Sequence, residues 1–170
     1  MRQVPCAEAM ARKYPEHIVL AVSADAAGAA DVITLGWAMP ASGAPPMWAV
    51  SIGHTRHSHG LIADGGEFVL AFPSVRMAEA CRVCGSVSGR DVDKLAAAGL
   101  RTEPAAFVRP PLLAGCLANF ECRVIASLVT GDHTVFVGEV LAAHVDDAES
   151  DRVYNFAGRF VPAHPGPAGA

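Results

Sequence analysis

The sequence predicts a mainly β protein, a closed or partly closed antiparallel barrel with a few short helices. Three observations lead to this expectation. Most apolar runs have the length of strands, two of them meet at a tight-turn signal, and the helical segments between them are short. At 170 residues with 52% hydrophobic side chains, the chain is long enough for one domain with its own core.

The predicted strands cover residues 17–25, 31–39, 45–53, 67–73, 118–132 and 133–147. The first two flank a Gly/Ala-rich turn and read as a hairpin. In the third, Trp48, Val50 and Ile52 share one face, because side chains alternate along a strand. The two longest strands meet at Gly131-Asp132, a tight-turn signal with period-2 patterns on both sides.

The predicted helices are short and cover residues 56–66, 75–85 and 91–100. Glycines close the first two, and the third begins at Asp91 or Asp93 as N-cap and stops at Gly99. We expect one domain over residues 1–150. Residues 151–170 form a C-terminal extension, which is partly disordered because its end is rich in Pro, Gly and Ala.

Composition narrows the function classes. A net charge of -4 argues against general nucleic-acid binding, which needs clustered basic residues. No apolar run is long enough for a membrane span and no signal peptide is evident, so the expected location is cytoplasmic and off the membrane. Five cysteines fit reduced thiols better than a disulfide framework. A charged fraction of only 18% suggests apolar surface that a partner chain covers.

The segment CRVCGSVSGRDVDK (81–94) supports two different chemistries. Its Cys-x-x-Cys pair is compatible with a metal or a redox disulfide, but no second cluster supplies the remaining ligands, and packing of two buried thiols is the simpler interpretation. Its glycines, serines, Arg90 and Lys94 suit a phosphate, with further positive charge expected if a helix starts near Asp91. Neither a Walker loop nor a dinucleotide fingerprint is present.

Several motifs resemble one family in its own order. CGSVSGRDVDK (84–94) is similar to the Cys-Gly-x-x-Ser-Gly-Arg-x-x-Asp-Lys signature of flavin reductase-like, flavoredoxin-type proteins. The segment 34–62, the strand GEFVLAFP and the pair within 120–147 also resemble that family, and VYNFAGRFVP does so more weakly. The resemblance covers roughly residues 14–147. It implies a homodimeric split β-barrel that binds FMN, and it favours phosphate over metal at residues 84–94.

The resemblance also suggests which residues would form the site, and these residues match the contacts that FMN requires. The phosphate is expected to meet Arg56, Ser58, Ser88, Gly89, Arg90 and Lys94. The ring edge is expected to meet the segment 34–42 and the following strand, with candidates Thr34, Leu35, Gly36, Trp37, Ser42, Ser51 and Ile52. Trp37 either stacks near the ring or fills the core. His133 is the candidate catalytic residue, facing flavin or nicotinamide, with a solvent-facing strand-edge histidine as the alternative. No metal ligand is assigned, and exposed loop residues are the simpler interpretation of His54 and His59.

The expected function is NAD(P)H-dependent reduction of FMN, with NADH or NADPH as the transient electron donor. The main alternative is a non-enzymatic electron carrier of flavoredoxin type that a partner protein reduces, and that passes electrons to an acceptor protein. A third alternative is a barrel that has lost its flavin and serves as a binding or structural module.

Overall fold

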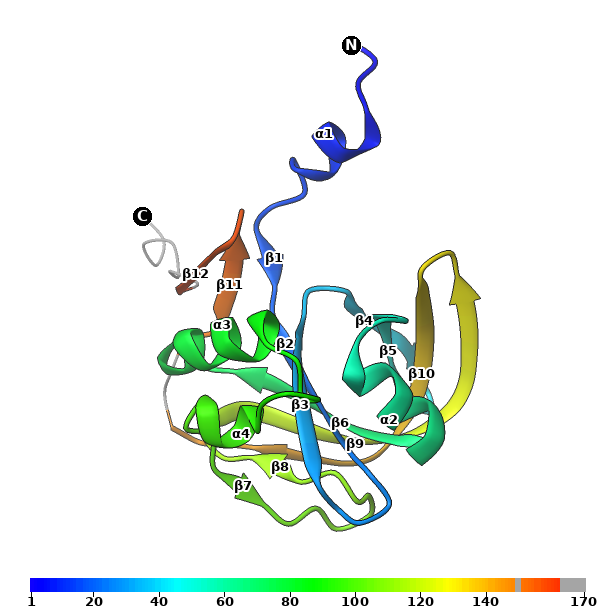
Figure 1. The fold of residues 1–170 in the computed structure, drawn as a ribbon, viewed down its shortest axis with the longest axis vertical. Coiled ribbons are helices and arrows are strands. Elements are labelled where there is room, and N and C mark those ends of the chain that lie inside the picture. The colour runs from blue at the N-terminus through cyan, green and yellow to red at the C-terminus, as the bar shows by residue number, and fades with distance from the viewer. Residues whose placement is uncertain (149–150, 163–170) are drawn as a thin grey trace.

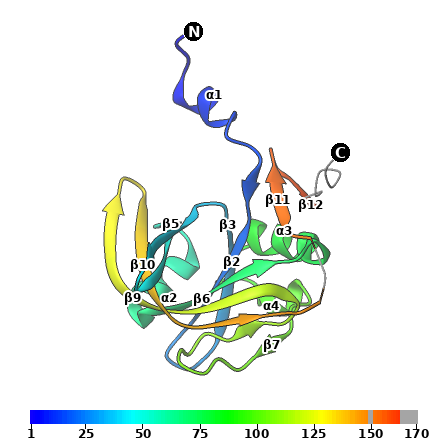
Figure 2. The ribbon, with the colours of Figure 1, turned by 180° about the vertical axis from the view of Figure 1, so that it is seen from behind.

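The computed structural model of the protein describes residues 1–148 and 151–162. A seven-stranded antiparallel sheet with the order β3-β2-β6-β9-β10-β5-β4 forms its centre (Figures 1 and 2). Its strands are β2 (Val19–Ala24), β3 (Ala30–Leu35), β4 (Ala38–Gly43), β5 (Pro46–Gly53), β6 (Glu67–Pro73), β9 (Cys116–Thr130) and β10 (His133–Val145). This sheet and a few short helices confirm the predicted fold class. The strand predicted over residues 31–39 ends at Leu35, and its last two residues begin β4, a separate strand that the sequence did not predict and whose residues are mostly exposed and include Pro40.

The two edges of the sheet are consecutive in the chain. Only Gly36 and Trp37 separate β3 from β4, although these strands lie at opposite ends of the strand order. The sheet must therefore curl until its edges approach each other at this point. The backbone amide of Ser51 on β5 donates to the carbonyl of Trp37 at 2.9 Å and holds the connection in place.

Irregular pairing gives the sheet part of its curvature. The pairing of β9 with β10 shifts register between Val137 and Gly138 and again between Val140 and Ala142, and such bulges bend a strand and increase its twist. Gly138 also makes room for a core side chain, since a Cβ at this position would lie 2.6 Å from the ring of Phe68. A larger residue here would displace the core.

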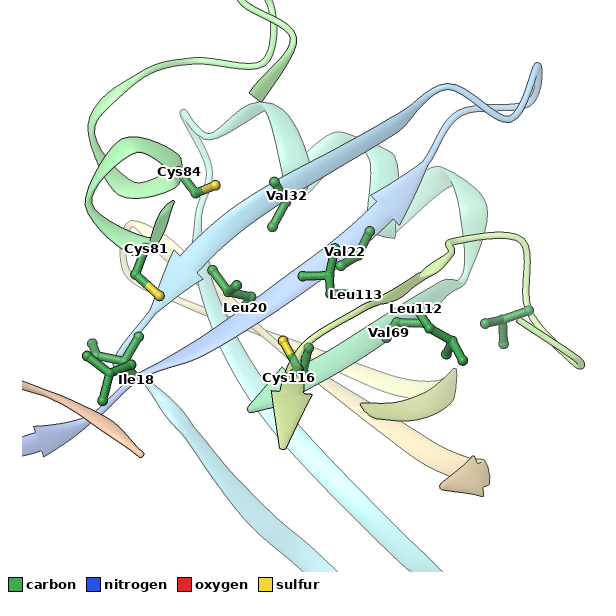
Figure 3. Close-up of a cluster of buried hydrophobic side chains, with 13 residues drawn as sticks. Ile18, Leu20, Val22, Val32, Val69, Cys81, Cys84, Leu112, Leu113 and Cys116 are labelled. Carbon is green, nitrogen blue, oxygen red and sulfur yellow. The ribbon is translucent and has the colours of Figure 1, made fainter. Parts of the chain in front are cut away.

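Two apolar clusters lie on opposite faces of β2. Val19 and Ala21 belong to the cluster inside the curled sheet, with Phe68, Leu70 and other residues from the surrounding strands. Leu20 and Val22 belong to the second cluster, which packs under α3 and the chain around residues 108–116 (Figure 3). Because both faces are covered, this strand is a continuous apolar run rather than an alternating one.

The helices are short. They are α1 (Cys6–Met10), α2 (His57–Gly65), the 3-10 turn η1 (Val75–Met77), α3 (Ala78–Ser86) and α4 (Lys94–Ala97). Of these, α2, α3 and α4 pack against the sheet, whereas α1 lies apart from it at the N-terminal end (Figure 1). Gly66 closes α2 in a left-handed conformation, as expected. Asp93 caps α4 through the amide of Ala96, so Asp93, rather than Asp91, is the N-cap. Within residues 1–148 and 151–162, no helix is long and apolar enough to span a membrane.

Two small sheets complete the fold. The first joins β1 (Glu16–His17) to β11 (Val153–Phe156) and β12 (Arg159–Pro162), so residues near both ends of the chain pair with each other. The second joins β7 (Thr102–Glu103) to β8 (Leu112–Leu113). The proposed division at residue 150 stays a prediction, and most of the tail expected to be disordered, residues 163–170, lies outside the described residues.

A buried carboxylate fixes the loop that precedes β8. Glu121 on β9 is fully buried and accepts hydrogen bonds from the backbone amides of Ala106, Phe107 and Val108 and from Nε2 of His144. Burial would raise the pKa of Glu121, but the amide bonds and His144 outweigh it, and the net shift is downward. The sequence analysis did not identify this carboxylate.

Four of the five cysteines are buried and only Cys6 is exposed. Cys81 and Cys84 face the second cluster from α3 and lie among aliphatic side chains, which supports packing over redox chemistry (Figure 3). Burial raises the pKa of Cys81 to about 12 and that of Cys84 to about 11. Both are therefore protonated thiols at neutral pH.

We predict that a thiol reagent such as DTNB modifies one cysteine per folded chain at about pH 8, and all five after unfolding. The four buried thiols lack both access and thiolate character. Absorbance at the thionitrobenzoate band measures the count, and the Cys6→Ser variant serves as the control, with no rapid reaction expected. Rapid reaction of two or more thiols in the folded protein would contradict this assignment.

Candidate functional site

A cavity of about 350 Å³ opens beside the point where the sheet edges approach, and this volume is within the range of small-molecule sites. The cavity lies among the end of β3, the turn to β4, the start of α2 and the chain that leaves α3. Its lining residues are Glu16, Ile33, Thr34, Leu35, Gly36, Trp37, Ser51, Gly53, Thr55, Arg56, His57, Ser58, Cys84, Gly85, Ser86, Val87, Ser88, Gly89, Lys94 and His133.

Short contacts hold these segments together. The hydroxyl of Thr34 donates to the carbonyl of Cys81 at 2.6 Å and ties β3 to α3. Gly85 follows on the same helix, and a Cβ there would lie 3.4 Å from Thr34. The amide of Arg56 donates to the carbonyl of Gly53, and this turn starts α2 directly after β5. The cavity wall is therefore built from segments that are linked by hydrogen bonds and close packing.

A buried ionic cluster lies behind one wall of the cavity. Lys94 and Asp31 are 4% and 5% exposed, and Nζ of Lys94 lies 3.0 Å from Oδ1 of Asp31. The hydroxyl of Ser58 donates a short hydrogen bond to Oδ2 of the same carboxylate. Gly89 packs against Oδ1 so closely that a Cβ there would lie 2.2 Å from it. Asp31 thus contacts three of the residues that the family resemblance assigned to phosphate, Ser58, Gly89 and Lys94.

The loop between α3 and α4 differs from the expected arrangement. The amides of Asp91 and Val92 both donate to the carbonyl of Ser88, so this stretch is a turn, and the following helix begins only at Lys94 and has four residues. The expected helix N-terminus beside Ser88 and Arg90 is therefore absent from the described loop. The Ser88 hydroxyl accepts a hydrogen bond from the amide of Arg90, and its own proton has no acceptor among the described residues.

The basic residues of the loop and of α2 are placed differently. Arg56 is exposed and lines the cavity. Arg90 lies at the rim, where its Nη1 donates to the carbonyl of Thr55 at 3.0 Å, and it is not among the lining residues. This bond ties the loop to the start of α2. The expected phosphate role of Arg90 stays a prediction that would use its other N–H groups.

An aromatic pair stands at the mouth of the cavity. The rings of Trp37 and His133 are 4.8 Å apart between centroids, and Trp37 is exposed, so the alternative that it fills the core is wrong. Nδ1 of His133 donates to Oδ1 of Asp132 at 2.7 Å, and this bond lowers the pKa of Asp132. In a neutral imidazole with this tautomer, Nε2 is left as an acceptor on the side of Gly53.

Glu16 lines the cavity and, like Asp31, was not identified in the sequence analysis. Its carboxylate lies over Gly36, where a Cβ would come within 2.6 Å of Glu16 Cδ. Lys13 and Asn155 hold it, the latter through Nδ2 at 3.0 Å from Oε1. The cavity therefore contains a carboxylate as well as basic groups. Neither Glu16 nor Asp31 belongs to a motif, and only their tertiary contacts identify them.

The remaining predicted residues divide as follows. Of the cofactor candidates, all line the cavity except Ser42, Ile52 and Arg90. Ser42 lies farther along β4, opposite Met47. The side chain of Ile52 is fully buried in the core, so only its main chain remains available to a ligand. The lining candidates are Thr34, Leu35, Gly36, Trp37, Ser51, Arg56, Ser58, Ser88, Gly89 and Lys94, with His133.

The neighbouring histidines form a separate group. His54 and His59 both contact the hydroxyl of Thr134, at 3.2 and 2.9 Å, and their rings pack edge to face. Burial and the neighbouring His54 lower the pKa of His59. His54 is exposed as expected, but His59 is partly buried and packs against the ring of Phe136.

Comparison with known proteins gives a consistent assignment. The family model for the flavin reductase like domain matches residues 10–164. Among solved structures, the flavoredoxin of Desulfovibrio vulgaris (Miyazaki F) superposes with a TM-score of 0.83 at 23% identity, covering 100% of this chain and 97% of its own.

Two further solved structures share this fold. An FMN-binding protein from Thermus thermophilus gives a TM-score of 0.85 at 24% identity, covering 99% and 98% of the two chains. The NADH:FAD oxidoreductase SgcE6 of Streptomyces globisporus gives 0.84 at 20% identity, covering 97% and 99%. The family model spans nearly the whole chain and these folds agree with it, so this protein belongs to the flavin reductase-like family.

Proposed function

We propose that the chain binds FMN in this cavity and that NADH or NADPH reduces the bound flavin. The observation that carries the proposal is one cavity that combines basic groups, Arg56 and Lys94, with an aromatic mouth formed by Trp37 and His133. A flavin mononucleotide needs both, since its phosphate requires cationic donors and its ring a flat surface. The names of the Thermus and Streptomyces proteins support flavin binding and the use of NADH.

The residues present fit this group. Lys94 has N–H groups beyond the one near Asp31, Ser88 keeps a free hydroxyl proton, and Arg56 offers a planar fork. Gly36 and Gly89 contribute only main-chain atoms to the cavity lining. Bound FMN would supply the hydride acceptance that no amino-acid side chain provides.

The protein residues bind and orient. Arg56 and Lys94 would neutralise the phosphate, and the main chain of Thr34–Gly36 would face the ring edge. Trp37 would restrict access of water at the mouth. His133, fixed by Asp132, would present Nε2 to the ring or to the nicotinamide. The protein needs no acid or base of its own for hydride transfer.

We predict that the chain binds about one FMN at micromolar concentration and that Arg56→Gln weakens binding by roughly 10- to 100-fold, because a charge-assisted hydrogen bond contributes about 1.5–3 kcal/mol. Riboflavin, which lacks the phosphate, should change by less than about threefold. Flavin fluorescence titration measures both. Arg82→Gln, an exposed arginine on α3 that is paired with Glu79, is the matched control. If the wild type binds neither flavin, the third alternative, a barrel without flavin, takes the place of this proposal.

We predict that both NADH and NADPH bleach the bound FMN, with a preference below about a hundredfold, because no acidic residue at dinucleotide-fold spacing rejects the 2′-phosphate. His133→Ala should slow hydride transfer more than it weakens FMN. Stopped-flow absorbance with each nucleotide measures these rates. If dithionite reduces the flavin but neither nucleotide does so within minutes, the chain is an electron carrier of flavoredoxin type that depends on a partner protein.

We further propose that the chain is a homodimer. The pairing register places Met39, Ala49 and Val137 in one cross-strand row and Val135 beside Leu128 in the next, on the outer face of the sheet. Met39 and Leu128 are 60% and 66% exposed, and an apolar groove of about 240 Å³ runs beside Trp37. A contiguous apolar face of this kind is typical of an interface, and a second copy seated here would border the cavity.

The predicted result is a dimer mass by light scattering at micromolar concentration, shifted toward monomer by Leu128→Asp. An aspartate in a desolvated interface is costly because its charge has no partner there. Phe107→Asp is the control, because Phe107 is similarly exposed, at 60%, but lies in the loop held by Glu121. A wild-type monomer mass, or equal dissociation of both variants, would contradict this interface.

A further inference from the structure

The buried carboxylate behind the cavity wall has no role in the proposed chemistry, yet it contacts the residues expected to bind phosphate. Asp31 is the second residue of β3 and does not line the cavity. Its Oδ2 accepts the proton of Ser58, so that hydroxyl has no proton left for another acceptor. Ser58 is thus a partner of Asp31 rather than a free phosphate donor.

The other oxygen of the carboxylate neutralises Lys94. Nζ lies 3.0 Å from Oδ1, without the alignment of a hydrogen bond, and Oδ1 has no hydrogen-bond donor among the described residues. Lys94 itself is almost fully buried, and a buried ammonium without a counter-charge would be costly. Asp31 supplies that counter-charge from the side of the protein, while Lys94 also borders the cavity.

We propose that Asp31 is an internal counter-ion for Lys94. When the cavity is empty, its carboxylate takes the place of the ligand's phosphate, and when the cavity is filled, it weakens the attraction between Lys94 and that phosphate. This inference rests on the proposed binding of FMN. It implies that the site stays preformed without flavin and releases flavin readily. The flavin then behaves as an exchanging substrate rather than a permanently bound group.

The physical reason is competition between two anions for one ammonium. A carboxylate and a phosphate on either side of Lys94 share its charge and repel each other, and at low effective dielectric these terms are large. The same carboxylate removes the cost of an unpaired buried charge from the empty protein. Asp31 therefore raises the stability of the empty state and lowers the affinity for an anionic ligand.

The neutral isostere Asp31→Asn separates this role from a purely structural one. We expect about tenfold tighter FMN, slower FMN release, and riboflavin affinity within about threefold of the wild type. The flavin-free variant should unfold at a lower temperature than the wild type. In a Lys94→Met background, the same substitution should leave the ratio of FMN to riboflavin affinity unchanged, because the cation for which the anions compete is gone.

Fluorescence titration, FMN dissociation kinetics and thermal unfolding of the flavin-free protein provide the readouts. An unchanged or reduced FMN-to-riboflavin ratio in Asp31→Asn would overturn the inference, as would the same gain in the Lys94→Met background. If Asp31→Asn does not fold, Asp31→Ser takes its place with the same expectations. If neither variant folds, the carboxylate is required for the fold itself and the inference is overturned. Absence of flavin binding by the wild type would instead refute the proposed function, while the unfolding temperatures still test the counter-ion.

Discussion

The pairing of β9 with β10 is the interaction on which the rest of the structure depends. These two strands pair from Thr130 with His133 to Ala118 with Val145, and they carry β6 on one side and β5 on the other. Their bulges help to turn a long ribbon into a curved one. Without that curvature, β3 and β4 could not be both the outer edges of the sheet and neighbours across two residues. The cavity exists because these edges approach each other without pairing along their length.

The predictable part of the fold is the part whose pattern is local. Alternating and continuous apolar runs identified the main strands. A strand with one buried face alternates apolar and polar residues, and a strand with both faces buried is apolar throughout. The short strands at the chain ends left no such signature, since two to four residues contain too few positions. The Gly131-Asp132 turn could be predicted because the tight connection between two long strands needs a left-handed residue, which glycine adopts easily.

Only the part of the candidate site that lies in the family-like motifs could be predicted from the sequence. The resemblance indicated many of the residues that line the cavity, between Thr34 and Lys94 and at His133, although three of its candidates lie outside the lining. The roles of these residues are predictions. The roles of Asp31 and Glu16 could not be predicted, because the sequence pattern of an acidic residue on a strand is the same whether its side chain faces solvent or a buried amine. Of the two expected N-caps, Asp93 rather than Asp91 starts the helix, since the amides of Asp91 and Val92 donate to the carbonyl of Ser88 in a turn. The proposed phosphate recognition would therefore depend more on side-chain charge than on a helix dipole.

The contact between Glu16 and Asn155 has a consequence for biosynthesis. Glu16 lines the cavity, and 139 residues separate it from the amide that holds its carboxylate. The strand that bears Glu16 leaves the ribosome well before its partner β11. All strands of the curled sheet have emerged by the time β11 leaves the ribosome, but this wall of the cavity still lacks Asn155. In a nascent chain, Glu16 therefore gains this contact, and this wall of the cavity is completed, only after β11 has emerged.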